Sequence, residues 1–293
     1  MMRILLLGNT GQLGWEAERA LACLGEVTAL DYPEVDFSRP EGLRALVASV
    51  KPEVIYNAAA YTAVDRAESE PDKARLINAV APGVLAEEAR RNRAAFIHIS
   101  TDYVFDGAKG SPYVEEDDPH PLNVYGQTKL EGEQAALQAG DAVIVLRTAW
   151  VYSTRRDSFV TKVLQWARRQ TTLRVVDDQV SNPTWARALA EASALLLARG
   201  GEDWLAWLRE RRGLYHLAGS GSASRYRWAQ AILECDPDSH EQTVKELLPA
   251  STAEFPAPAV RPLVSVLNCE RFARTFGLQL PPWEAALRLA MQK

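Results

Sequence analysis

The chain has 293 residues, of which 47% are hydrophobic and 24% charged, a composition typical of a globular protein with a sizeable core. Its net charge of −5 argues against nucleic acid or an anionic membrane as partner, because both call for a basic surface. No apolar run is long enough to span a membrane. The cysteines Cys23, Cys235 and Cys269 lie far apart without metal or disulfide spacing, which predicts small core thiols and a cytoplasmic protein.

Strands and helices are predicted to alternate along the first half of the chain. An apolar run at residues 4–7 that ends in a glycine turn predicts a buried parallel strand, and a helix over 13–24 is expected to stop at Gly25. Further strands are predicted at 27–30, 54–56, 96–99 and 143–146, with helices at 43–50 and 72–92. This order predicts right-handed βαβ units and a doubly wound, Rossmann-type parallel sheet with both faces covered.

The second half of the chain changes character. Helices are predicted at 159–168 and 187–197, strands at 173–176 and 214–217, and a solvated charged helix face at 202–212. Three prolines within 250–262 predict a loop. We therefore expect a dinucleotide-binding domain over 1–152 and a smaller α/β substrate-binding domain over 153–293, with segments of the two interleaved.

A glycine-rich turn follows the first predicted strand. Gly8, Gly11 and Gly14 would let the backbone approach a pyrophosphate at the start of a helix, where the helix dipole attracts negative charge. The alternative is a purely structural strand–helix turn. Asp31 ends the second predicted strand, 20 residues after Gly11, where a carboxylate binds the adenosine ribose. Because that carboxylate repels a 2′-phosphate, Asp31 favours NADH.

Two further segments are candidates for contact with the cofactor. Asp36 and Phe37 are placed to cover the adenine, although Asp36 would equally serve as a cap for the helix that follows Pro40. The small residues at 57–60 end the third strand and would let the cofactor lie against the backbone. Tight packing between strand and helix explains those small residues equally well.

Tyr125 and Lys129 stand four residues apart at a predicted helix start, which places both on one helical face. An ammonium group beside a phenol lowers the phenol's pKa, so Tyr125 could transfer a proton near neutral pH. Thr101 ends the fourth strand, where its hydroxyl could bond a carbonyl under reduction. The alternatives are a solvated helix face for the pair and a strand-end cap for Thr101. His98 is predicted to be a core histidine, and no histidine has a ligand-spaced partner for a metal.

Motifs spread along most of the chain carry a family resemblance. They are GNTGQLGWE (8–16), NAAAYTAVD (57–65), STDYVFDG (100–107), PLNVYGQTK (121–129), RTAWVY (147–152), DQVSNPT (178–184) and GLYHL (213–217). In these motifs the chain resembles the dTDP-4-dehydrorhamnose reductase family of the extended short-chain dehydrogenase/reductases. The resemblance implies reduction of the C4 keto group of dTDP-4-dehydro-β-L-rhamnose to dTDP-L-rhamnose by NADPH or NADH.

The resemblance also implies roles for individual residues. The catalytic group would be Thr101, Tyr125 and Lys129. Cofactor contacts are implied at Gln12, Leu13, Asp31, Asp36, Phe37, Ala60, Tyr61, Thr62, Tyr125 and Lys129. Contacts with the sugar nucleotide are implied at Thr101, Asp102, Trp150 and Arg261, although Trp150 could instead be a core residue. The resemblance also leaves Mg²⁺ open, because some family members need it. A homodimer is a further possibility for the assembly.

The sequence departs from the family pattern beside Arg261. The family often has a second basic residue before this arginine and a polar residue after the proline, where this chain has Val260 and Leu263. Two alternatives therefore stay open. One is a non-catalytic dinucleotide-binding subunit, similar to the regulatory subunit of methionine adenosyltransferase. The other is a reductase or epimerase acting on another nucleotide sugar.

Overall fold

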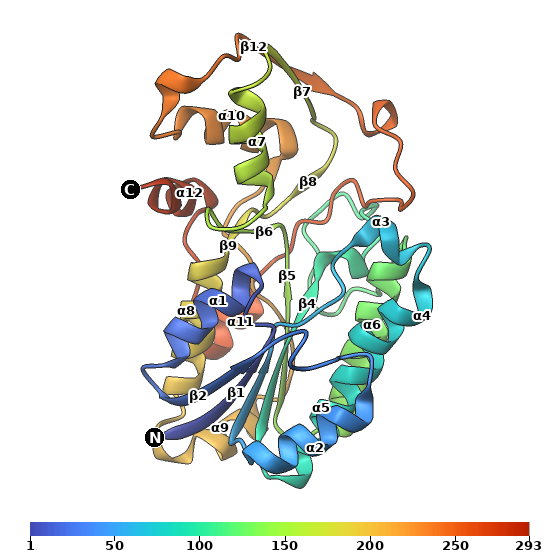
Figure 1. Cartoon of the computed structure of the whole chain (residues 1–293), viewed down its shortest axis with the longest axis vertical. Coiled ribbons are helices and arrows are strands. Elements are labelled where there is room, and N and C mark those ends of the chain that lie inside the picture. The colour runs from blue at the N-terminus through green and yellow to red at the C-terminus, as the bar shows by residue number, and fades with distance from the viewer. Residues whose placement is uncertain (293) are drawn as a thin grey trace.

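The computed structural model describes residues 1–292, and a six-stranded parallel sheet forms the centre of its larger lobe (Figure 1). The strand order across the sheet is β10-β5-β4-β3-β1-β2. The bounds are β1 (Met2–Leu7), β2 (Gly25–Leu30), β3 (Val54–Asn57), β4 (Ala95–Thr101), β5 (Val143–Thr148) and β10 (Gly213–His216). This arrangement confirms the predicted Rossmann-type α/β class.

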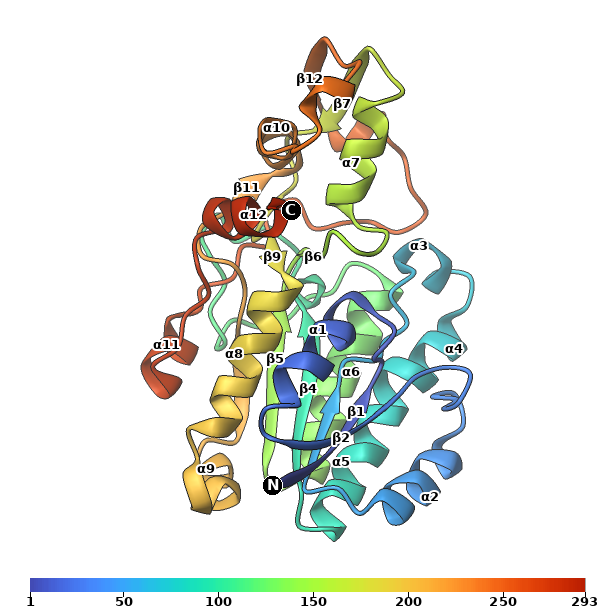
Figure 2. The same cartoon turned by 60° about the vertical axis from the view of Figure 1, so that its left-hand side comes forward.

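Helices cover both faces of the sheet (Figures 1 and 2). One face carries α1 (Gln12–Leu21) and α8 (Ala186–Ala198), and the other carries α2 (Pro40–Val50), α5 (Ala81–Arg91) and α6 (Val124–Ala139). In β1, Ile4 and Leu6 enter the core on the first face, whereas Leu5 and Leu7 enter the core on the second. The continuous apolar run of β1 is therefore explained by burial of both faces.

The sixth strand of the sheet comes from the second half of the sequence. β10 pairs in parallel with β5, and Tyr215 lies opposite Leu146 in this register. Helices α9 (Trp204–Glu210) and α11 (Glu270–Phe276) flank the same edge, and α8 packs along α1. Residues beyond 152 thus complete both the sheet and one of its helical layers.

A smaller lobe stands over the carboxyl ends of the strands (Figure 2). Its centre is the parallel pair β7 (Thr172–Val176) and β12 (Glu246–Ala250), which packs with α7 (Phe159–Ala167) and α10 (Arg225–Glu234). Two-stranded ladders join β6 (Val151–Tyr152) to β9 (Thr184–Trp185), and β8 (Val180–Ser181) to β11 (Ala223–Ser224). The remaining elements are α3 (Val64–Ala67), α4 (Pro71–Arg75), α12 (Trp283–Met291), a π-turn at Leu76–Val80, and 3₁₀ turns at Asp102–Val104, Gly201–Asp203, Ser239–Glu241 and Thr252–Glu254.

Three local predictions need correction. Helix α1 ends at Leu21 rather than residue 24, and Gly25 begins β2 instead of ending the helix. Glycine is required at this position because a Cβ there would lie 1.9 Å from the carbonyl oxygen of Met2. The helix predicted over 72–92 is interrupted by the π-turn at Leu76–Val80. Cys23 is exposed rather than a core thiol, while the other two cysteines are partly buried and all three are free. Among residues 1–292, no helix combines the length and apolarity needed to cross a bilayer.

Candidate active site

The glycine turn after β1 is packed too closely for any other residue at two positions. Gly8 has a φ of 86°, and a Cβ there would lie 2.6 Å from the amide nitrogen of Ala59. A Cβ on Gly14 would lie 1.9 Å from the carbonyl oxygen of Gly8. Gly11 is the N-cap of α1 and provides no side-chain cap, which leaves the first amide groups of the helix open. This cradle fits a diphosphate, because open amides and the helix dipole both attract negative charge.

A cleft of about 560 Å³ runs along the carboxyl edge of the sheet from this turn. It brings together most of the predicted cofactor residues with the predicted catalytic ones. The predicted residues that line it are Gly8, Gly11, Gln12, Leu13, Gly14, Asp31, Ala60, Thr62, Thr101, Asp102, Tyr125, Lys129 and Trp150. Arg156, which sequence reasoning missed, also lines the cleft from the loop between β6 and α7.

Asp31 lies at the end of β2 and is bonded to the glycine turn. Its Oδ2 accepts hydrogen bonds from the backbone nitrogen of Thr10 at 3.1 Å and from the Thr10 hydroxyl at 2.5 Å. Its Oδ1 accepts a bond from the backbone nitrogen of Tyr32 at 2.8 Å. The carboxylate is therefore held beside the cradle, at the strand end where a ribose would lie.

Three predicted cofactor residues do not line the cleft. Phe37 is buried in the core beneath α2 and is only 7% exposed. Tyr61 directs its hydroxyl to Glu70, at 2.8 Å. Asp36 accepts bonds from the backbone and hydroxyl of Ser38, and α2 begins without a side-chain cap. The alternative interpretation of Asp36 as the cap of this helix is therefore wrong.

Tyr125 and Lys129 lie on the first turns of α6, on the same helical face. The helix begins at Val124 because Asn123 caps it, accepting a hydrogen bond from the backbone nitrogen of Gly126 at 2.8 Å. Thr101 ends β4, and its hydroxyl lowers the pKa of Tyr125 by hydrogen bonding. Burial has the larger effect and raises that pKa above its ordinary value. The expected lowering of the pKa by Lys129 is not found, because the lysine amine bonds elsewhere.

The amine of Lys129 is directed into the interior of the sheet. Lys129 is 1% exposed, and its Nζ donates a hydrogen bond to the carbonyl oxygen of Ile99 at 2.6 Å. The Nε2 atom of His98 lies 3.3 Å from the same Nζ. Burial lowers the pKa of Lys129 to about 8. His98 is fully buried as predicted, yet it contacts a residue of the cleft.

Asp102 joins the two lobes. Its Oδ2 accepts hydrogen bonds from the hydroxyls of Ser265 at 2.5 Å and Ser181 at 3.1 Å, both from segments after residue 152. The side chain is 2% exposed, and burial raises the pKa of this carboxyl to about 6. These bonds hold the small lobe against the end of β4, next to Thr101.

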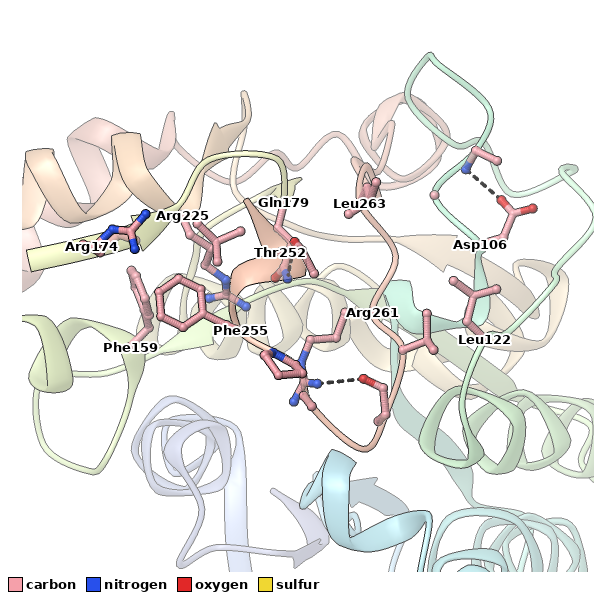
Figure 3. Close-up of a pocket in the computed structure, with 18 of the residues that line it drawn as sticks. Asp106, Leu122, Phe159, Arg174, Gln179, Arg225, Thr252, Phe255, Arg261 and Leu263 are labelled. Atoms are coloured by element: carbon pink, nitrogen blue, oxygen red, sulfur yellow. Dashed lines mark hydrogen bonds between the residues drawn. The ribbon is translucent and has the colours of Figure 1, made fainter. Parts of the chain in front are cut away.

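A second cavity of about 930 Å³ lies between the small lobe and the segment that joins β4 to α6, from which Asp106 and Leu122 line it; the loop after β12 closes one side (Figure 3). Three arginines from separate elements line it: Arg174 of β7, Arg225 of α10 and Arg261 of the loop. Phe159 and Phe255 supply part of its apolar lining. Sequence reasoning found Arg261 alone, because no local spacing links arginines that lie 51 and 36 residues apart.

The loop that carries Arg261 is fastened to the large lobe. Arg261 Nη2 lies 2.7 Å from Asp65 Oδ2, and Arg261 Nη1 donates to the carbonyl oxygen of Ala259 at 2.8 Å. Asp65 Oδ1 also accepts a bond from the backbone nitrogen of Ala259, at 3.2 Å. Val260 and Leu263, which replace the residues usual in the family, are 61% and 45% exposed.

A donor set for a divalent cation is not assembled among the residues that the structure describes. Across residues 1–292, no three histidine, cysteine or acidic side chains are grouped to hold a metal ion. The Mg²⁺ that the resemblance left open therefore has no matching ligand cluster in this part of the chain.

A parallel sheet with a glycine cradle, and a Tyr-x-x-x-Lys helix at its carboxyl edge, are the features of Rossmann-type nicotinamide-dependent oxidoreductases. Comparison with known proteins narrows this class. The family described as the RmlD substrate binding domain matches residues 2–293, and the chain belongs to that family.

Three relatives place the chain within the family. It is 41% identical to the dTDP-4-dehydrorhamnose reductase of Burkholderia thailandensis, over 99% of this chain and 98% of the relative. It is 40% identical to a probable dTDP-4,6-dihydroxy-2-methyloxan-3-one 4-ketoreductase of Streptomyces antibioticus, over 99% and 94%. The crystal structure of dTDP-4-dehydrorhamnose reductase from Bacillus anthracis in complex with NADP superposes with a TM-score of 0.88, at 31% identity and 98% coverage of both chains.

Proposed function

We propose that the protein is an NAD(P)H-dependent dTDP-4-dehydrorhamnose reductase. It reduces the C4 keto group of dTDP-4-dehydro-β-L-rhamnose and forms dTDP-L-rhamnose. The observation that carries the proposal is the meeting of Thr101, Tyr125 and Lys129 in the same cleft as the glycine cradle. The relatives at 40% identity or more, which reduce nucleotide sugars by name, supply the substrate class.

Different residues of the cleft bind the cofactor, hold the keto oxygen and supply the proton. The reduced nicotinamide supplies the hydride when the cofactor is bound. Gly8 and Gly14 keep the cradle open for the diphosphate, and Asp31 binds the adenosine ribose. Tyr125 donates its phenolic proton to the keto oxygen, while Thr101 holds that oxygen by a hydrogen bond. Lys129 lies one helical turn after Tyr125 in the same cleft, where it would bond the nicotinamide ribose.

The second cavity suits the nucleotide part of the substrate. A diphosphate carries negative charge on oxygens that guanidinium groups bind in a bidentate manner. Arg225 and Arg261 line the cavity, and Phe159 and Phe255 offer apolar surface to a base. We infer that the diphosphate lies near the two arginines, with the sugar directed toward Thr101 and Tyr125.

A second candidate function is reduction of a different dTDP-4-keto sugar. The relative from Streptomyces antibioticus favours it, because it is named as a 4-ketoreductase of a different dTDP-linked sugar and its identity to this chain is nearly the same. A non-catalytic dinucleotide-binding subunit is less well supported, because it has no need to keep Thr101, Tyr125 and Lys129 together in one cleft.

A coupled assay tests the proposal. The protein is supplied with dTDP-4-dehydro-β-L-rhamnose, made enzymatically in the same vessel, and oxidation of NADPH or NADH is followed by absorbance. We expect turnover, dTDP-L-rhamnose as product, and protein that purifies without bound dinucleotide. Turnover of another dTDP-4-keto sugar alone would favour the second candidate. Tightly retained dinucleotide would indicate an epimerase, and dinucleotide binding without turnover would support the regulatory subunit.

A further inference from the structure

Two buried residues beyond the catalytic group form a chain of polar contacts that ends at Lys129. Asn57, at the end of β3, lies opposite His98 of β4 in the register of the parallel sheet. Asn57 Nδ2 is 3.1 Å from His98 Nδ1, and His98 Nε2 is 3.3 Å from Lys129 Nζ. Exposure of the three residues is 2%, 0% and 1% respectively, so water does not substitute for these contacts.

The backbone fixes the orientation of the Asn57 amide. Its Oδ1 accepts a hydrogen bond from the backbone nitrogen of Ala59 at 3.2 Å. Because a backbone N–H can only donate, the amide oxygen must face Ala59 and the NH₂ group must face His98. His98 Nδ1 then accepts from Asn57. In a neutral imidazole one nitrogen carries the proton and the other accepts, so the proton of His98 lies on Nε2.

The neutral state of His98 follows from its surroundings. Burial lowers the pKa of His98 well below its ordinary value, and the neighbouring Lys129 adds to the effect. The Nε2–H group therefore points at Lys129 Nζ and needs an acceptor there. An ammonium has no lone pair, whereas a neutral amine has one. The contact between His98 and Lys129 is a hydrogen bond only when Lys129 is neutral.

In the described part of the chain, no charged group around Lys129 bonds its amine in a way that would favour the ammonium form over the neutral form. Glu133, one turn further along α6, raises the pKa of Lys129 through its charge. Its carboxylate, however, is bonded to Arg147 Nε at 2.9 Å, to Arg147 Nη2 at 2.7 Å and to the Ser100 hydroxyl at 2.5 Å. The other ionisable residues that line the same cleft are Asp31, Asp102, Tyr125, Arg156 and Asp157. Among residues 1–292, Lys129 Nζ has polar contacts with His98 Nε2 and the carbonyl oxygen of Ile99, so no carboxylate bonds the ammonium form directly.

We propose that His98 and Asn57 are positioning residues that hold Lys129 and stabilise its neutral amine, so that Lys129 can return a proton to Tyr125. This inference rests on the proposed reductase function. After Tyr125 gives its proton to the substrate, the ammonium of Lys129 passes one proton to the phenolate, directly or through a bridging hydroxyl. A phenol and a neutral amine result, and the amine accepts the Nε2–H bond of His98. Water then reprotonates the amine.

The sign of a pH shift tests this arrangement. In a plot of kcat against pH, we expect kcat to fall at high pH as Lys129 loses its proton. This fall is the basic limb. His98→Leu removes a donor that favours the amine, so the limb should move to higher pH by about 0.5–1 unit, the effect of one ordinary hydrogen bond. Asn57→Leu frees the His98 tautomer and should move the limb in the same direction by less. A shift to lower pH would mean that His98 accepts from an ammonium, which overturns the proposal.

A matched variant separates the polar chain from packing. The Phe96 ring stacks on His98 with centroids 5.8 Å apart, but Phe96 has no polar contact with Lys129. Phe96→Leu should lower Tm and leave the basic limb in place. If His98→Leu behaves in the same way as Phe96→Leu, the role of His98 is structural and the proposal fails.

A measurement without turnover keeps this inference separate from the proposed function. In ¹⁵N-labelled protein, long-range proton–nitrogen spectra show which imidazole nitrogen carries the proton, and His98→Leu assigns the signal. We expect the proton on Nε2 in wild type, and a mixture of tautomers in Asn57→Leu. A proton on Nδ1 in wild type overturns the inference, whatever sugar the enzyme reduces. If the coupled assay shows no turnover but the spectra place the proton on Nε2, the proposed reductase function is overturned and the arrangement of His98 and Asn57 stands.

Discussion

The guanidinium carbon of Arg225 lies 3.6 Å from the centroid of the Trp150 indole ring. Trp228 stacks on Trp150 at 5.5 Å between centroids, nearly in parallel. Trp150 lines the cleft and Arg225 lines the second cavity, so the pair forms a shared wall between the two. Trp150 also has a φ of 40°, in the left-handed region that bulky residues rarely adopt, which fits a position held for function.

Trp150→Phe should weaken the hold on Arg225 and raise KM for the sugar nucleotide. A cation–π contact contributes about 0.5–2 kcal/mol, which corresponds to roughly 2- to 30-fold in KM. Trp207→Phe is the control, because Arg211 contacts Trp207 in the same manner far from both cavities, at 4.6 Å. Steady-state kinetics and a melting curve decide the matter. A large fall in Tm with unchanged KM would make Trp150 a core residue.

Tyr125→Phe removes the phenolic proton and keeps the ring. We expect kcat to fall by at least about 100-fold, the low end for general acid–base catalysis, with little change in Kd for the cofactor. Single-turnover kinetics and cofactor fluorescence titration measure the two quantities. Tyr215→Phe, beneath α11, should leave both unchanged. Near-normal turnover in Tyr125→Phe would assign the proton to another donor.

Asp31→Ala should shift cofactor selectivity toward NADPH. The change removes a carboxylate that opposes a 2′-phosphate, so the ratio of kcat/KM for NADPH to that for NADH should rise. Asp31 also bonds the Thr10 hydroxyl, and Thr10→Val removes that bond while keeping the charge. The Thr10 variant should keep the wild-type ratio. An unchanged ratio in Asp31→Ala would show that this carboxylate does not bind the ribose.

Glu133→Gln should lower the free energy of unfolding by about 3–5 kcal/mol, because it leaves the Arg147 guanidinium buried without a countercharge. Both side chains are 3% exposed. Glu191→Gln is the comparison, since its pair with Arg187 is exposed and should contribute only about 0.3–0.5 kcal/mol. Urea denaturation of the three proteins measures the difference. Equal losses in the two variants would contradict the assigned burial.

Asp102 should make the free energy of unfolding decrease as the pH rises. An ordinary ion-paired carboxyl has the opposite effect. Its pKa in the folded protein is raised from 3.8 to about 6, so the stability that its protonated form contributes is lost as the pH rises through 6. Relative to Asp102→Asn, wild type should lose about 1.4 kcal/mol between pH 5 and 7.5, the equivalent of one pKa unit. Urea denaturation at both pH values checks this. A relative gain by wild type would reverse the assigned shift.

Periodicity along the chain was enough to predict the sheet and the Tyr125–Lys129 face of α6, because both depend on neighbours in sequence. The partners of Lys129 were not predictable, since His98 and Asn57 reach it only through the register of β3 with β4. The arginine cavity was missed for the same reason, because Arg174 and Arg225 meet only after the small lobe forms. The core position of Phe37 was not predictable either, because an aromatic residue after a strand can turn to the core as easily as to a ligand.

The position of β10 has a consequence for the growing chain during synthesis. Until Gly213–His216 has been made, β5 has no neighbour on one side and presents a row of free backbone donors and acceptors. Such an edge invites pairing with other chains, and β5 is buried along its whole length in the finished protein. A ribosome must therefore add 68 further residues, from 149 to 216, after β5 before this surface is protected. Fragments that stop near residue 152 should aggregate, however well they bind dinucleotide.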